Sequence, residues 1–75
     1  MKSAQVRHRL LKATGLTYRQ WAMQRNINPR TVTQTVSRWA GRSDLPRGRK
    51  SFAILRELSR EIGREIVPGV LEEVA

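Results

Sequence analysis

The stretch that decides the fold is Trp21-Ala22-Met23-Gln24-Arg25-Asn26-Ile27-Asn28-Pro29-Arg30-Thr31-Val32. Asn26 is one of the few non-glycine residues that tolerate the positive φ of a tight turn. Asn28 is a preferred N-cap, and Pro29 follows it at the first helical position, where a missing N–H costs nothing. The stretch therefore predicts two short helices separated by a turn over residues 26–28, which is a helix-turn-helix.

The segments on either side of this turn predict the other helices. Thr17 and Gln20 have the spacing of a capping box, Ser3 is placed to cap an earlier helix, and Gly15 is suited to end it. The predicted helices cover residues 4–13, 18–25, 29–39, 51–62 and 68–74, the last being either a short helix or an apolar tail. We expect residues 1–75 to form a single all-α domain, a four- or five-helix bundle around the helix-turn-helix.

Helical spacing of the apolar residues also predicts the core. Its expected members are Val6, Leu10, Tyr18, Trp21, Ala22, Val32, Val36, Trp39, Phe52, Ile54, Leu55, Leu58 and Ile62, with Thr35 at the margin. A chain of 75 residues without cysteine is near the lower limit for folding without staples. The absence of cysteine, of a signal-peptide pattern and of a membrane-spanning run predicts a soluble cytoplasmic protein.

The charge is distributed unevenly along the chain. The formal net charge is +9, and twelve of the fifteen Lys and Arg residues are arginine. Residues 1–50 hold twelve of these cations against Asp44 alone, whereas residues 51–75 hold three arginines against five glutamates. Such a basic surface predicts a polyanionic partner, with double-stranded DNA the leading candidate. A merely solubilising surface, or one that binds an acidic protein or a membrane, is the alternative.

The predicted helix over residues 29–39 has an outward face without acids. A merely hydrophilic face would carry Glu and Lys, which form helices better than Thr, Ser and Asn. Arg30 can bridge guanine O6 and N7, Gln34 can bridge adenine N6 and N7, and the Thr33 methyl can meet a thymine methyl. The residues predicted to read bases are Asn28, Arg30, Thr33, Gln34 and Ser37.

A second group of polar and basic residues flanks this face. We expect them to hold phosphates, in the first turn of the helix over 18–25, beside the reading face, and in the loop over 41–50. They are Arg19, Gln20, Thr31, Arg38, Arg42, Arg47, Arg49 and Lys50. For the loop, a mobile charged segment without fixed contacts is an equal alternative.

Catalytic and ligand-binding motifs are missing from the sequence. It contains no Ser/His/Asp set of plausible spacing, no paired acids and no phosphate-binding glycine loop, so we expect no enzyme and no small-molecule substrate. His8 stands without a second histidine or a cysteine, and we expect neither a metal nor another cofactor.

Trp21-Ala22, Asn26, the run from Ile27 to Val32, and Gln34 resemble small helix-turn-helix proteins of Mu-like prophages. More loosely, they resemble the lambda repressor and Cro superfamily. The resemblance covers residues 16–40 well and extends weakly to the helix over 51–62. It implies sequence-specific DNA binding in phage transcriptional control, as by a repressor, with residues 29–39 as the recognition helix. The chain departs from the family at Asn26, where glycine is usual, and at Thr35, where an aliphatic residue is usual.

A single helix-turn-helix rarely reaches regulatory affinity, so we expect a homodimer, at least on DNA. The acidic and apolar section over 52–75 is the expected dimer surface, because its charge would not repel a second copy. Two other hypotheses stay open. The chain is then either an architectural or recombination accessory protein with little sequence preference, or a basic module that binds an acidic protein.

Overall fold

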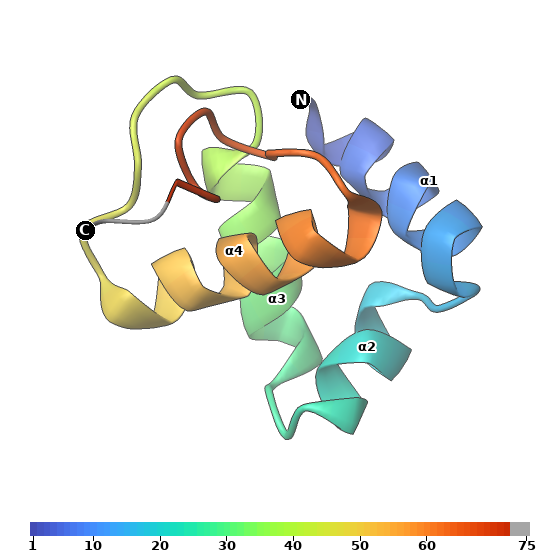
Figure 1. The fold of residues 1–75 in the computed structure, drawn as a ribbon. Helices are drawn as coiled ribbons and strands as arrows, with labels where there is room; N and C mark the ends of the chain where they lie inside the picture. Colours follow the sequence, from blue (N-terminus) through green and yellow to red (C-terminus); the bar gives the residue numbers. More distant parts are fainter. Residues whose placement is uncertain (73–75) are drawn as a thin grey trace.

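A computed structural model describes residues 1–72 and shows an all-helical fold, with four α-helices and no strand in that part of the chain. The helices are α1 (Ser3–Thr14), α2 (Tyr18–Gln24), α3 (Pro29–Trp39) and α4 (Arg49–Ile62). In Figure 1, α4 crosses in front of α3, α1 and α2 lie to one side, and the segment after α4 doubles back above it.

The turn between α2 and α3 has the predicted local structure. Asn26 adopts a φ of 55°, the only positive φ outside glycine among residues 1–72. The Asn28 side chain accepts a hydrogen bond from the Arg30 amide at 2.9 Å, which confirms the predicted cap. The capping box of Thr17 and Gln20 before α2 is also present. Local sequence rules therefore place both helices of the unit correctly.

Two helices begin one or two residues earlier than predicted, and Ser3 is not the N-cap of the first. The first residue of α1 is Ser3 itself, and its N-cap is Lys2, whose carbonyl oxygen accepts from the Gln5 and Val6 amides. The first residue of α4 is Arg49 rather than residue 51, because the Phe52 amide reaches the carbonyl oxygen of Gly48. Arg49 and Lys50 thus belong to the first turn of α4 and not to the loop.

The predicted helix over 68–74 is absent from residues 68–72, and its last two positions lie outside the described residues. The Val70 amide bonds to the Val67 carbonyl and the Glu72 amide to that of Gly69, which makes successive tight turns. Gly69 has a φ of 87°, a conformation that cannot continue a right-handed helix. Pro68 therefore begins a turn and not a helix.

One hydrophobic core joins all four helices to the segment that follows them. Its fully buried members include Val6 and Leu10 of α1, Trp21 of α2, and Leu55 and Leu58 of α4. The segment after α4 adds a further set that the sequence did not assign to the core: Ile66, Val67 and Val70, all 0% exposed. Four predicted core residues are instead only partly buried against it: Tyr18, Trp39, Phe52 and Ile62.

The segment after α4 is fixed by a buried hydrogen bond. The Ile66 amide donates to Oγ of Ser59 at 3.1 Å, and Ser59 is fully buried in α4. The Leu71 amide donates to the carboxylate of Glu65. The chain after Gly63 is thereby held on the core without a helix of its own.

Candidate nucleic-acid interface

The α3 helix has one buried and one exposed face. Val32, Thr35 and Val36 are buried, and Thr35, which stands where the resemblance has an aliphatic residue, is only 7% exposed. Arg30, Gln34 and Ser37 are exposed and follow one another at helical spacing of four and three residues. They therefore form one stripe along the outer side of α3.

The other two residues predicted to read bases flank this stripe, and each has part of its side chain engaged. The Thr33 hydroxyl donates to the Pro29 carbonyl oxygen at 3.1 Å, so its methyl group is the part free for a thymine methyl. The Asn28 side-chain oxygen caps the Arg30 amide, and its NH₂ group remains as a donor. The five residues thus lie on and beside one exposed helix face.

All the residues predicted to hold phosphates are exposed, but they fall into separate groups. Arg19 and Gln20 lie in the first turn of α2, where the Gln20 side-chain oxygen accepts from the Thr17 amide. Thr31 and Lys50 line a groove of about 420 Å³ between the turn and α4. Asn28 and Glu57 line the same groove, so one acid lies near this group.

The remaining predicted phosphate contacts lie at and beyond the C-terminal end of α3. Arg38 and Arg42 both approach the ring of Trp39, at 5.9 and 5.5 Å from its centroid. Arg47 is in the loop before α4, and Arg49 begins that helix. The loop is attached to the body through Pro46, which is buried. Leu45 packs beside Gly69. Its Cδ1 lies 3.7 Å from the position that a Cβ atom would take if residue 69 had a side chain.

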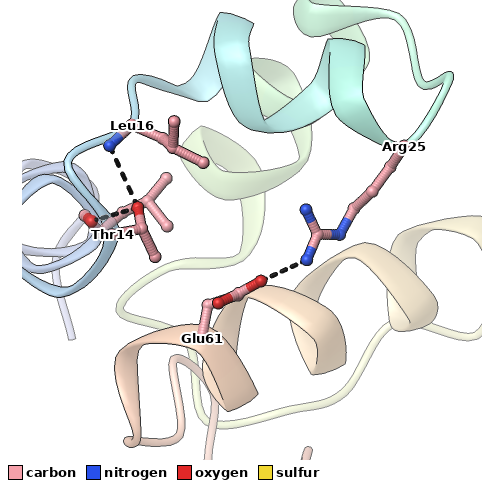
Figure 2. A network of polar contacts seen from close by, with 5 residues as sticks. Thr14, Leu16, Arg25 and Glu61 are labelled. Atoms are coloured by element: carbon pink, nitrogen blue, oxygen red, sulfur yellow. Dashed lines mark hydrogen bonds and ion pairs between the residues drawn. The ribbon is translucent and has the colours of Figure 1, made fainter.

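Arg25 is a cation of the helix-turn-helix with a structural role. Its guanidinium lies 4.2 Å from the centroid of the Trp21 ring and pairs with the carboxylate of Glu61 on α4. Figure 2 shows the side chain reaching from the end of α2 to α4. This is the one ion pair within residues 1–72. No residue predicted to contact DNA forms an ion pair in that part of the chain.

Tyr18 also has a structural role. Its hydroxyl donates to the Ser3 carbonyl oxygen at 3.4 Å, which links α2 to α1. Burial raises the pKa of Tyr18 to about 12, against a smaller opposing effect of Arg7. Burial favours the neutral phenol because the charged form would lose hydration.

The raised pKa of Tyr18 predicts a loss of stability in alkali. Between pH 10 and about 12 the unfolded chain releases the phenolic proton while the folded chain retains it. The free energy of unfolding should therefore fall as the pH rises through this window. Urea denaturation across the window measures the decline, and Tyr18→Phe should flatten it. An equal decline in Tyr18→Phe would contradict this origin.

Comparison of the chain with protein-family models, with curated proteins and with solved structures finds no match. Among residues 1–72, no helix is long and apolar enough to cross a membrane. In the same residues, His, Asp and Glu side chains nowhere gather in a group of three that could hold a metal ion. The exposed face of α3, with the predicted base-reading residues on it, is the candidate site that the geometry offers.

Proposed function

We propose that this chain is a sequence-specific double-stranded DNA-binding protein that places α3 in the major groove. The observation that carries the proposal is the exposed stripe of Arg30, Gln34 and Ser37, on a helix without acids. These side chains match the hydrogen-bonding edges of guanine and adenine in the major groove. An α-helix also has the diameter that this groove accepts.

Helix propensity supports this assignment over an ordinary hydrophilic face. Besides Arg30, Gln34 and Arg38, the exposed positions of α3 carry Thr31, Thr33 and Ser37, which are poor helix formers. Exposed helix positions normally tolerate Glu and Lys, which would stabilise the helix more. A face that sacrifices helix stability at several positions favours a binding function.

The cations around α3 supply the phosphate contacts in this proposal. Arg19 precedes α3 on the N-terminal side of the turn, Lys50 lies across the groove beside Thr31, and Arg42 follows the C-terminal end of α3. In this proposal these cations contact the phosphates of the strands that border the groove. The resemblance to phage regulators extends the proposal to transcriptional control in the cytoplasm.

Selection of bound duplexes from a random pool tests the proposal. An enriched motif, bound more tightly than the unselected pool at the same salt concentration, is the expected result. Uniform salt-sensitive binding without a motif would replace sequence-specific regulation by an architectural role. No binding to any duplex would refute DNA binding and favour a basic module for an acidic protein.

We also propose that two copies bind a two-fold site. The apolar side chains of residues 52–71 lie mostly in the protein's own core, so charge is the remaining reason to place the contact on the C-terminal section. Exposed Glu57, Glu65 and Glu72 there would reduce repulsion between two basic chains. Sedimentation of the complex with a selected duplex should give two chains per site, and a strict monomer would refute this part.

A further inference from the structure

Two arginine side chains lie near the ring of Trp39 at the C-terminal end of α3. The ring belongs to the last residue of the helix and is partly buried against the core. Arg38 precedes it in the helix. Gly41, with a φ of 88°, turns the chain so that the Arg42 amide donates to the Trp39 carbonyl oxygen at 3.1 Å. This turn brings the second guanidinium to the same ring.

The chain contains a second arginine–tryptophan contact that serves as an internal comparison. Arg25 lies over Trp21 with its guanidinium 4.2 Å from the ring centroid, closer than Arg38 or Arg42 to Trp39, and it is neutralised by Glu61. Neither Arg38 nor Arg42 has a carboxylate within ion-pair distance among residues 1–72. Arginine therefore approaches a tryptophan ring with an internal anion at Trp21 and without one at Trp39. The uncompensated pair is available for an external anion.

Two guanidinium groups held near one ring suit a phosphodiester in particular. A guanidinium attracted to an aromatic ring still has N–H groups to donate, in a fork that matches phosphate oxygens. Restricting the side chains before binding also lowers the entropy that binding would otherwise cost. We infer that Arg38, Trp39 and Arg42 form a phosphodiester clamp, in which Trp39 is a positioning residue for the two arginines.

The phosphodiester in question is the backbone of the duplex that α3 reads, so this inference rests on the proposed function. Arg38 is eight residues beyond Arg30, which at about 1.5 Å per residue is about 12 Å along the helix. The major groove is also about 12 Å wide. The clamp is therefore far enough from the Arg30 base contact to reach a backbone strand that borders the groove.

Salt-dependent titration of a labelled, selected duplex tests the clamp. For Arg38→Ala/Arg42→Ala we expect a loss of at least tenfold in affinity and a decrease of about two in the slope of log K against log salt. For Trp39→Leu we expect a severalfold loss and a smaller slope, although both arginines remain. Trp39→Phe should retain most of the wild-type affinity and most of the wild-type slope, because phenylalanine keeps an aromatic ring.

The matched control removes two other exposed cations on α1, Arg7→Ala/Lys12→Ala, and should leave the slope nearly unchanged. Acrylamide quenching adds a readout that needs no substitution. Trp21 is 0% exposed, so quenchable fluorescence comes from Trp39, and duplex should protect it. Circular dichroism verifies that each variant folds. If Trp39→Leu does not fold, the Arg38→Ala/Arg42→Ala variant, Trp39→Phe and the quenching measurement still test the clamp.

The outcomes separate this inference from the proposed function. A wild-type chain that binds no duplex refutes the function and the clamp together. A wild-type chain that binds the selected duplex, with the Arg38/Arg42 double variant behaving like its control, overturns the clamp alone. Trp39 quenching unchanged by bound duplex would also overturn the clamp.

Discussion

Ile66→Ala should lower the free energy of unfolding by about 2–5 kcal/mol, because it removes a fully buried side chain and leaves a cavity. Ile66 is 0% exposed and packs in the same core as Trp21 and Leu55. A domain of this size has only a few kcal/mol of stability in total. The variant should therefore be largely unfolded in water, as measured by circular dichroism during urea titration.

Two further variants define the cause of this loss. Leu11→Ala truncates an aliphatic residue that is 52% exposed, and it should cost much less. Ser59→Ala should cost about 1–3 kcal/mol, because the buried Ile66 amide would lose its hydrogen-bond acceptor. If the unfolding midpoint of Ile66→Ala rose with protein concentration to the wild-type value, Ile66 would belong to an interface between two chains instead.

Arg30→Ala should weaken binding to the selected duplex by about 1–3 kcal/mol and relax sequence preference at one base pair. Arg30 lies at the N-terminal end of the exposed stripe, and its side chain has no ion-pair partner within residues 1–72. Loss of a bidentate contact to guanine removes discrimination but few phosphate contacts. Parallel titrations with the selected and a scrambled duplex measure both effects.

Arg19→Ala is the complementary variant. It should weaken binding to all sequences by a similar factor and reduce the salt slope by about one, because it removes a phosphate contact. Arg7→Ala removes the same charge from the exposed surface of α1 and serves as the control. Equal losses for Arg30→Ala on both duplexes would show that Arg30 holds a phosphate and does not read a base.

The parts of the fold that sequence predicted well depend on neighbouring residues. Asn26, Asn28 and Pro29 define the turn between α2 and α3 through backbone preferences and a side-chain cap that act within a few residues. The buried side of α3 followed in the same way from apolar spacing. The exposure of the stripe on the other side of α3 was therefore predictable as well.

The features that the sequence missed depend on residues far apart in the chain or on exact chain direction. The Arg25–Glu61 pair joins residues 36 positions apart, so no local pattern could indicate it. Burial of Ile66 depends on a chain reversal at Gly63 and on Ser59. Local patterns instead favoured a terminal helix after Pro68. The approach of Arg38 and Arg42 to the same ring depends on how the backbone turns at Gly41, which no local sequence pattern indicates.

Closure of the core by residues 66–70 has a consequence for synthesis on the ribosome. The helix-turn-helix emerges before α4, but α1 packs mainly against α4, and Val67 and Val70 complete the same core. A nascent chain that ends before Ile66 would leave apolar side chains of α1 and α4 in contact with water. Chaperones and proteases would therefore meet exposed apolar surface until residues 66–70 have left the exit tunnel.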